Sequence, residues 1–348
     1  MSLLILLHHF LFHHGRADAL VAVTVDHALR PQSAQEARFV AGFCTERQIR
    51  HITKIWSDPK PATGLAAAAR AARYRLLIEA AGDVGADCIL TGHTADDQAE
   101  TVFMRAERGA GLGLAGMAPE TLLDGSVWLL RPLLGLGRDA LRAVLREHSV
   151  AWIEDPSNDN PAAERVRARQ AMTAERRARM LEQAQAAAWE RRDLGQRAAV
   201  LVREHFSVAG DAVRVAEAFL HETDRDGALH AFRTLLCALG RQAHWPDAQR
   251  AAALYDALAQ PGFSGSLGGC VAAHRRAGIT LRLERRGKAA LEPRAAITMM
   301  FAGAALRAIV PDFDLAISSA LAELLGARSF PAAPGASAKC SIPLTHRA

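Results

Sequence analysis

The chain has 348 residues, half of them hydrophobic, with no low-complexity tract and a formal net charge of +5 at pH 7. This length and composition predict two or three domains with packed cores. The positive charge favours a polyanionic partner such as RNA. Arginine supplies nearly all of that charge, so a compositional preference for arginine is the alternative explanation. Five scattered cysteines with no Cys-x-x-Cys pair argue against a zinc ribbon, an iron–sulfur site or a disulfide framework, and indicate a reducing cytoplasm.

The first twelve residues are an apolar run that resembles a signal peptide. The run lacks a basic start and a small-residue cleavage site, and it is too short to span a membrane. We therefore expect a buried helix of the first domain and no membrane contact. The next helix is predicted over Ser33–Arg47, with Ser33 as its N-cap and Glu36 completing a capping box.

Apolar runs and helical patterns alternate along the first 160 residues. The predicted strands are 20–25, 49–56, 88–91, 127–130 and a short one from Trp152, and the predicted helices are 33–47, 64–81, one opening after residue 91, and 138–148. Alternating strands and helices predict a doubly wound, mostly parallel α/β sheet.

The character of the sequence changes after Pro161. Residues 162–205 are rich in alanine, arginine and glutamate and predict one long helix, with further helices to about residue 260. Residues 267–283 predict a β-hairpin that turns at Ala277-Gly278. We therefore predict a catalytic α/β domain over 1–160, a helical domain over 161–260, and a small C-terminal region over 261–348 with a hairpin and a poorly ordered tail.

Residues 91–101 read Thr-Gly-His-Thr-Ala-Asp-Asp-Gln-Ala-Glu-Thr and lie at a predicted strand-to-helix junction, where open α/β sheets bind ligands. The segment holds His93, Asp96, Asp97 and Glu100. Its three carboxylates share one helical face because they are spaced three or four residues apart. Such crowding favours a cation among them, either a metal ion or a substrate ammonium group. The alternative is an acidic first turn that complements the helix dipole.

Four segments occur together in one order. They are Val25-Asp26-His27-Ala28-Leu29-Arg30, the segment from His93 to Thr101, Arg108-Gly109-Ala110-Gly111, and Asp155-Pro156-Ser157-Asn158 followed by Arg165-Val166-Arg167-Ala168-Arg169. This set resembles the tRNA(Ile)-lysidine synthase family of the PP-loop ATP pyrophosphatase group, and a helix with Ala69-Arg70-Ala71-Ala72-Arg73-Tyr74 fits the same family. The resemblance covers about residues 1–170 well and weakens toward the hairpin.

The resemblance implies a fold, a reaction and a set of partners. The fold is a PP-loop α/β domain followed by a helical domain. The reaction uses ATP and Mg²⁺ to adenylate C2 of the wobble cytidine of a tRNA(Ile) with a CAU anticodon, and free L-lysine then displaces AMP. The implied protein is cytoplasmic and does not contact a membrane, and a homodimer is compatible with the resemblance.

The resemblance also assigns roles to residues of this sequence. Asp96, Asp97 and Glu100 would serve the metal and the lysine, with Asp96 and Asp97 as metal ligands and Asp97 and Glu100 nearest the lysine ammonium. Arg108 would stabilise charge in the adenylation transition state. The nucleotide would lie near Asp26, His27, His93, Gly109 and Gly111, and tRNA phosphates would meet Arg165, Arg167 and Arg169. Each group has a plainer alternative as a core, cap, turn or solvated surface residue.

One part of the family pattern is absent from the printed sequence. No Ser-Gly-Gly-x-Asp-Ser loop follows an initial strand, and residues 1–7 match the helix that comes after that loop. The missing strand would be central, so two strand edges are expected to be unpaired. We favour an N-terminally truncated form of a normal enzyme over a short protein that has lost catalysis. In both cases we expect residues 1–348 to adenylate tRNA poorly or not at all.

Two other function classes stay open. A PP-loop thiolase of tRNA would require a pair of cysteines for a cluster or a persulfide, and the cysteine spacing here does not supply such a pair. A non-catalytic tRNA-binding protein would keep the basic helices and bind tRNA in a salt-sensitive manner without ATP turnover.

Overall fold

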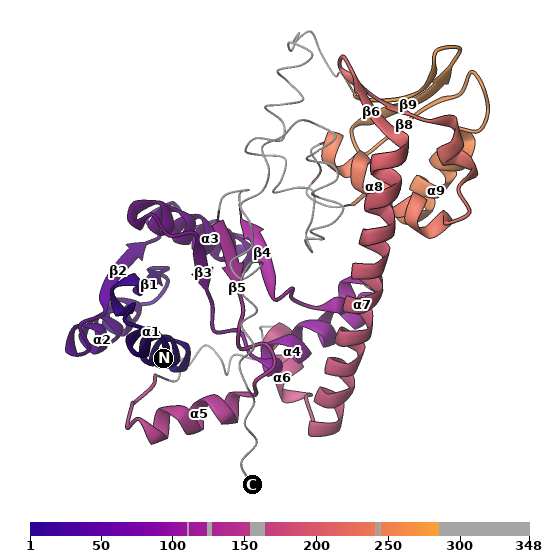
Figure 1. Ribbon diagram of the computed structural model, residues 1–348. Helices are drawn as coiled ribbons and strands as arrows, with labels where there is room; N and C mark the ends of the chain where they lie inside the picture. Colours follow the sequence, from indigo (N-terminus) through magenta and orange to yellow (C-terminus); the bar gives the residue numbers. More distant parts are fainter. Residues whose placement is uncertain (110, 124–126, 154–163, 241, 243–244, 285–348) are drawn as a thin grey trace. The chain divides into compact units, whose positions relative to one another are not determined.

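A computed structural model describes residues 1–109, 111–123, 127–153, 164–240, 242 and 245–284 (Figure 1). The chain forms two compact units. The first unit comprises Met1–Gly109 and Val127–Glu182, and the second unit comprises Ala110–Ser126 and Gln183–Ala348. The predicted three-part division at residues 160 and 260 stays a prediction.

The first unit contains two pairs of parallel strands. Strand β1 (Val21–Asp26) pairs with β2 (Arg50–Ile55), and β3 (Cys88–Leu90) pairs with β5 (Val127–Leu130). Strands β1, β3 and β5 are mainly apolar, whereas β2 combines polar residues with the β-branched Ile52, Thr53 and Ile55. The parallel order confirms the predicted α/β class. In the described part of the unit, β1 pairs only with β2, and β3 lies at the end of its own sheet, so both present an open edge.

Helices cover these strands. They are α1 (Ser2–His13), α2 (Ser33–Glu46), α3 (Leu65–Val84), α4 (Ala95–Ala106), α5 (Arg138–Glu147), α6 (Glu164–Gln170) and the start of α7 (Ala174–His205), with a 3₁₀ turn η1 at Ala17–Ala19. Helix α3 packs on β1, β2 and β3, whereas α1 packs on α5 and α6 packs on α4. The parallel connections thus bring α4 to the carboxyl end of β3.

Four sequence predictions for the first unit are wrong. Ser33 is the first helical residue and not the cap; its hydroxyl donates to the carbonyl of Arg30. Residues 151–153 form no strand. Residues 171–173 interrupt the predicted long helix, so it becomes α6 and α7. The segment 154–163, with its Asp155-Pro156-Ser157-Asn158 turn, lies outside the described residues.

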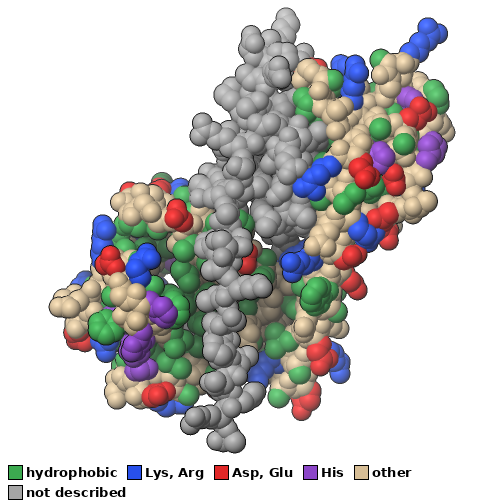
Figure 2. Space-filling view, viewed as in Figure 1, with side chains coloured by type: hydrophobic (Ala, Val, Ile, Leu, Met, Phe, Trp, Pro, Cys, Tyr) green, Lys and Arg blue, Asp and Glu red, His purple; other side chains and the backbone are tan. Residues whose placement is uncertain are grey.

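The fourth correction concerns the N-terminal helix, which is buried on one face only. Ile5 is in the core, whereas Phe12 is 65% exposed. Apolar side chains surround this helix, so one neighbouring layer, α5, cannot cover them all. Figure 2 shows histidine side chains among hydrophobic ones on the visible face of the unit that contains α1. No helix in the described ranges is long and apolar enough to cross a membrane.

The second unit is built on a five-stranded antiparallel sheet. Its strands, in the order β6-β7-β10-β9-β8, are β6 (Phe206–Ala209), β7 (Ala212–Val215), β8 (Ser264–Leu267), β9 (Cys270–Arg275) and β10 (Gly278–Leu283). Its other elements are η2 (Gly111–Ala115), β4 (Glu120–Leu123), η4 (Glu217–His221), α8 (Arg225–Leu239) and α9 (Ala248–Ala257). The predicted hairpin is confirmed as β9 and β10, but its two-residue loop is Arg276-Ala277 and not Ala277-Gly278, because Gly278 pairs with Arg275. The prediction of helix alone between 205 and 260 misses β6 and β7.

A buried histidine in this unit makes its stability dependent on pH. His230 is 3% exposed, packs edge-on against Trp245, and has an Nε2 atom without a hydrogen-bond partner among the described residues. Burial, with a smaller effect of Arg233, lowers the pKa of His230 to about 4. As the pH falls below 6.5, His230 therefore binds a proton in the unfolded chain before it does so in the folded chain.

Because of this histidine, we expect the free energy of unfolding of the second unit to fall by about 3 kcal/mol as the pH is lowered from 6.5 to 4. The full stability is present above pH 6.5 and is lost as the pH falls. A His230→Phe variant should show a flatter profile in urea unfolding measured across this range. Parallel profiles for the variant and the original chain would show that His230 is not the titrating group.

Candidate active site

The N-terminus of α4 is fixed by a capping box. The Thr94 hydroxyl accepts from the Asp97 backbone N–H at 3.2 Å, and Oδ2 of Asp97 accepts from the Thr94 backbone N–H and hydroxyl, both at 2.8 Å. The local sequence causes this arrangement, because Thr and Asp three residues apart satisfy each other's backbone at a helix start. Oδ2 of Asp97 therefore caps the helix, as expected for an acidic first turn that complements the helix dipole. Oδ1 of Asp97 faces the neighbouring helices α5 and α6.

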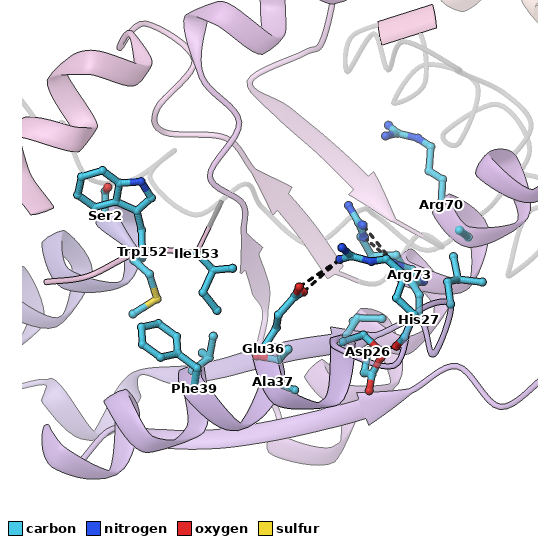
Figure 3. A pocket seen from close by; sticks show the side chains of 18 of the residues that line it. Ser2, Asp26, His27, Glu36, Ala37, Phe39, Arg70, Arg73, Trp152 and Ile153 are labelled. Atoms are coloured by element: carbon cyan, nitrogen blue, oxygen red, sulfur yellow. Dashed lines mark hydrogen bonds and ion pairs between the residues drawn. The ribbon is translucent and has the colours of Figure 1, made fainter. Parts of the chain in front are cut away.

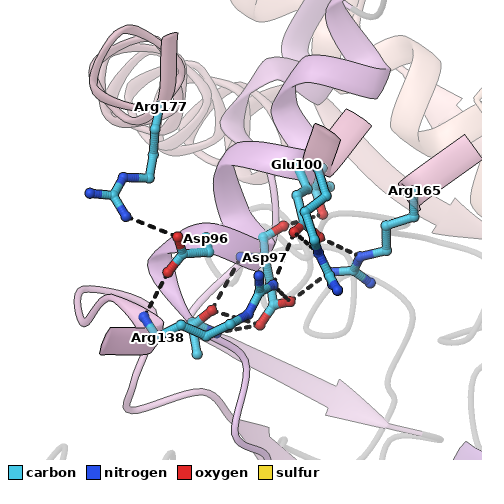
Figure 4. A network of polar contacts seen from close by, with 9 residues as sticks. Asp96, Asp97, Glu100, Arg138, Arg165 and Arg177 are labelled. Carbon is cyan, nitrogen blue, oxygen red and sulfur yellow. Dashed lines mark hydrogen bonds and ion pairs between the residues drawn. The ribbon is translucent and has the colours of Figure 1, made fainter. Parts of the chain in front are cut away.

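Glu100 lies one turn further along α4, is 1% exposed, and is surrounded by guanidinium groups (Figure 4). Its Oε1 accepts from Arg138 at 2.9 Å and from Arg169 at 2.8 Å, and its Oε2 accepts from Arg165 at 2.8 Å. Arg138 and Arg165 also donate to Oδ1 of Asp97, at 3.0 and 3.1 Å. Two arginines thus bridge Asp97 and Glu100.

Asp96 connects α4 to the start of α5. Its Oδ2 accepts from the backbone N–H of Arg138 at 2.7 Å, and its Oδ1 accepts from Arg177 at 2.9 Å. A carboxylate at a helix N-terminus satisfies an otherwise unpaired N–H and complements the helix dipole. Gly137 precedes the helix there, and a Cβ at that position would lie 3.7 Å from Oδ2 of Asp96. A Cβ there would be in ordinary van der Waals contact with Asp96.

Guanidinium groups of the chain itself lie among the three carboxylates, and the metal ion or substrate ammonium group that their spacing predicts stays a prediction. Burial would raise the pKa of Glu100, but hydrogen bonds from Arg169, Arg165 and Arg138 outweigh it and hold that pKa below its usual value. The pKa of Asp97 is also lowered, because bonds from Thr94 and nearby arginines outweigh burial. All three acidic groups are thus ionised at neutral pH, since the pKa of Asp96 is lowered as well.

This donor set does not fit a magnesium ion as it stands. Mg²⁺ requires oxygen ligands in near-octahedral geometry. The oxygens of Asp96 and of Asp97 already accept from backbone N–H groups, a hydroxyl or guanidinium groups. Across the described ranges, no three histidine, cysteine, aspartate or glutamate residues are grouped so that they could hold a metal ion.

A cavity of about 840 Å³ opens beside the exposed edge of β1 in the same unit (Figure 3). Two residues predicted for the nucleotide, Asp26 and His27, line it at the carboxyl end of β1. Nε2 of His27 accepts from Arg73 at 3.2 and 3.1 Å, and burial, followed by that arginine, lowers the pKa of His27. The guanidinium groups of the wall belong to Arg30, Arg70, Arg73, Arg138 and Arg142. The cavity thus combines the size of a cofactor site with positive charge.

The turn after β1 is held in an unusual conformation. Oδ1 of Asp26 accepts from the backbone N–H of Ala28 at 2.8 Å, and Ala28 has a φ of +50°. A left-handed conformation costs a residue with a Cβ about 1–2 kcal/mol. The Asp26 carboxylate therefore stabilises a strained turn at the mouth of the cavity.

An Ala28→Gly variant is expected to have a free energy of unfolding about 0.5–1 kcal/mol higher than the original chain. Glycine removes the strain of the left-handed conformation, and the greater entropy of the unfolded chain with glycine offsets only part of that gain. The matched control is Ala71→Gly on the exposed side of α3, which should destabilise the protein by about 1 kcal/mol. Chemical denaturation measures both. A destabilising Ala28→Gly change would contradict the assigned strain.

The remaining predicted residues lie in three places. His93 follows β3, and its Nδ1 is 2.9 Å from the Thr91 hydroxyl; burial and then Arg131 lower its pKa to about 4. Arg108 forms an ion pair with Glu164, the first residue of α6. Gly109 and Gly111 have φ values of +66° and +48°, a left-handed conformation that favours glycine. Of the α6 arginines, Arg165 and Arg169 contact the carboxylates and Arg167 is exposed.

Sequence reasoning missed Arg138 and Arg177. Arg138 contacts all three predicted carboxylates, through its backbone N–H and its guanidinium group. Its position directly after Gly137 at a predicted helix start was a usable signal, because the first turn of a helix after a β-strand faces the same sheet edge. For Arg177 the sequence offers no comparable signal, since it is one of several arginines on a long helix.

Comparisons with known proteins agree with this architecture. Residues 1–176, about half of the chain, match the family described as the PP-loop domain. The chain therefore belongs to the PP-loop domain family.

Similar proteins include a tRNA(Ile)-lysidine synthase of Mesorhizobium japonicum, 47% identical over 295 residues, which are 82% of this chain and 65% of the relative. One of Brucella ovis is 50% identical over 198 residues, 56% of this chain and 44% of the relative. The chain thus spans less than two thirds of the length of these curated relatives. Among solved structures, the U34-tRNA thiolase NcsA from Methanococcus maripaludis with its 4Fe-4S cluster gives a TM-score of 0.44 at 15% identity, over 56% of this chain and 68% of that one.

Proposed function

We propose that this chain carries the active-site residues of an ATP-dependent ligase that joins lysine to the wobble cytidine of an isoleucine tRNA. In the first step the C2 oxygen of the cytidine attacks the α-phosphate of ATP and pyrophosphate leaves. In the second step the ε-amine of lysine attacks C2 and AMP leaves. The observation that carries the proposal is the group of three ionised carboxylates at the end of β3, in a PP-loop domain beside a cationic cavity.

ATP is assigned to the cavity of about 840 Å³. Asp26 and His27 would meet the adenine and ribose, and the guanidinium groups of the wall would offset the phosphate charge. His93, with a pKa of about 4, would stand by the nucleotide as a neutral hydrogen-bonding group. The loop of Gly109 and Gly111 would allow close backbone approach, with Arg108 stabilising charge in the transition state.

Lysine is assigned to the carboxylates of Asp97 and Glu100. Because Arg165 bridges both of them, an ammonium group would have to share or take its place. The Mg²⁺ assignment to Asp96 and Asp97 stays a prediction: a metal ion there would have to replace hydrogen bonds from arginine. Magnesium bound mainly through ATP phosphates would agree better with this donor set. A cytoplasmic location and a homodimer also stay predictions.

The tRNA contact is assigned to the arginines of α6. Arg165 and Arg169 make ion pairs with Glu100 and keep 41% and 34% of their side chains exposed, and Arg167 is an exposed residue of the same helix. We expect Arg167→Ala to weaken tRNA binding and to lower the slope of log affinity against log salt by about one. Filter binding at several salt concentrations measures this, with Arg38→Ala on the exposed side of α2 as the control. An unchanged slope for Arg167→Ala would remove the RNA contact from this helix.

A non-catalytic tRNA-binding protein is the second candidate. It is favoured by the guanidinium groups that already satisfy Asp97 and Glu100. It predicts salt-sensitive tRNA binding in which ATP and lysine change nothing. Adding ATP and L-lysine to residues 1–348 distinguishes the two: the ligase proposal expects each to bind and protect the protein against thermal unfolding, and the second candidate expects neither to do so.

A further inference from the structure

A separate cavity of about 410 Å³ lies within the second unit, between α7 and α8 (Figure 1). Its volume falls in the range of about 300–1,000 Å³ that is typical of small-molecule sites. On α7 its lining runs from Glu190 to Arg197, and on α8 it runs from Asp226 to Arg233. Each of these pairs is separated by about two helical turns, so each helix contributes one stripe of side chains to the cavity.

One buried imidazole in the lining has an open hydrogen-bonding position. His230 is 3% exposed, and its Nε2 atom has no hydrogen-bond partner within the described ranges. Trp245 packs edge-on against the ring, with 5.1 Å between the ring centroids, so packing holds the ring in place. Buried polar atoms are almost always paired, and an exception calls for a ligand or a water molecule.

The two guanidinium groups of the lining are already engaged. Arg197 donates through Nε to Asp193 at 2.9 Å and through Nη1 to Asp224. Arg233 donates through Nε and Nη2 to the carbonyl oxygen of Pro246, at 3.2 and 2.9 Å. Arg197 is therefore balanced by two carboxylates, and Arg233 is directed toward the segment that precedes α9.

The unbalanced charge of this cavity is negative. Glu190 and Asp226 line it, one on each helix, and neither has a hydrogen bond or an ion pair among the described residues. Together with Asp193 and Asp224, they set four carboxylates against two guanidinium groups. An approaching phosphate group would be repelled by this excess, whereas an ammonium group would be attracted.

We propose that this cavity, which we call the α7–α8 cavity, binds a linear aliphatic amine that carries two or more ammonium groups. One ammonium group donates to Nε2 of His230, and another pairs with the carboxylates of Glu190 and Asp226. The methylene chain packs on Leu194 and Leu229, which belong to the same lining. Burial lowers the pKa of His230 to about 4, so the imidazole is uncharged at neutral pH and does not repel the ligand. The inference concerns the second unit alone and is independent of the proposed function.

A series of ligands tests the chemistry of the α7–α8 cavity. RNA-free protein, residues 1–348, is titrated by calorimetry with spermidine, with cadaverine, and with 1,5-pentanediol, which has the length of cadaverine but no charge. Both amines should bind, and pentanediol should bind about 10- to 100-fold more weakly than cadaverine, because it lacks hydrogen bonds from a charged donor. Equal binding of pentanediol and cadaverine, or no binding of either amine, would overturn the proposal.

Magnesium chloride provides the control for diffuse attraction to acidic side chains. Magnesium requires several oxygen ligands in near-octahedral geometry, so an equal concentration of its charge should not displace spermidine. Displacement at that concentration would mean that the carboxylates attract any cation, and the amine site would be withdrawn.

A pair of variants locates the site on α8. Asp226→Asn should weaken the binding of both amines about tenfold or more, because one charged acceptor is lost. Glu217→Gln, at an exposed acidic residue of the same unit outside the lining, should leave both affinities unchanged. Equal thermal unfolding temperatures of the two variants show that the fold is intact. An unchanged affinity of a folded Asp226→Asn variant would contradict the proposal.

Nitrogen-15 NMR of labelled histidine tests the contact with His230 directly. The Nε2 signal of His230 is identified by its absence from the spectrum of His230→Phe. Spermidine at a concentration near its dissociation constant should shift this signal in the original chain, and should shift it much less in Asp226→Asn. If a short RNA shifts the signal and spermidine does not, the cavity belongs to RNA and the proposal is wrong.

Discussion

Replacing Glu100 with glutamine is expected to lower the free energy of unfolding by about 3 kcal/mol. The carboxylate is 1% exposed and balances three guanidinium groups, and removing one member of a buried charge network typically costs about 3–5 kcal/mol. We take the lower end because the arginine side chains are 30–41% exposed and recover part of their hydration. Urea unfolding measures the change, with Glu107→Gln at the exposed end of α4 as the matched control.

The pH dependence of this variant provides an independent check. The pKa of Glu100 lies below its ordinary value in the folded protein, so the unfolded chain takes up the proton first as the pH falls. The stabilisation from Glu100 is therefore complete above a pH of about 4.3 and is lost as the pH falls below it. The difference between the original chain and Glu100→Gln should narrow in acid. A difference that stays constant from pH 7 to pH 3 would show that the charge of Glu100 contributes nothing.

Replacing Arg138 with methionine is expected to cost about 2 kcal/mol, because its guanidinium group donates to both Asp97 and Glu100 while its backbone N–H to Asp96 remains. The control is Arg146→Met, on the exposed side of the same helix. Chemical denaturation of the single variants gives both values.

A double-mutant cycle then tests whether Arg138 and Glu100 act together. The variant with both Arg138→Met and Glu100→Gln should lose about 1–3 kcal/mol less than the sum of the single losses, as contacting charges do. Additive losses would mean that the two side chains stabilise the protein independently, and the network drawn in Figure 4 would not describe their energetics.

The success of sequence reasoning followed the range of the interactions involved. The α4 cluster was predictable because helical spacing and a capping pattern are local, and both lie within residues 94–100. The parallel α/β class followed from the alternation of strands and helices. The contacts of Arg169 and Arg177 were not predictable, because these residues reach the carboxylates from 69 and 81 residues away in the chain.

The errors in secondary structure have similar causes. Strands β6 and β7 have four residues each, too few for alternation to stand out beside a long alanine-rich helix. Ser33 was expected as a cap because Glu36 follows it by three residues, but Glu36 instead pairs with Arg30 at 3.3 Å. The break at residues 171–173 carries no glycine or proline, but Thr173 caps the start of α7, because its hydroxyl accepts from the backbone N–H of Arg176 at 3.2 Å.

The central claim is that these residues can serve lysine transfer to tRNA, and one measurement tests it most directly. Labelled lysine, ATP and a tRNA(Ile) transcript with a CAU anticodon are incubated with residues 1–348, alone and after fusion at Met1 to the loop-bearing N-terminal segment of a tRNA(Ile)-lysidine synthase such as the Mesorhizobium japonicum relative. We expect little or no incorporation by residues 1–348 alone, because their sequence contains no Ser-Gly-Gly-x-Asp-Ser loop to hold pyrophosphate. The fusion should incorporate lysine, and Glu100→Gln should abolish that incorporation. A folded fusion that binds tRNA but transfers no lysine would contradict the account.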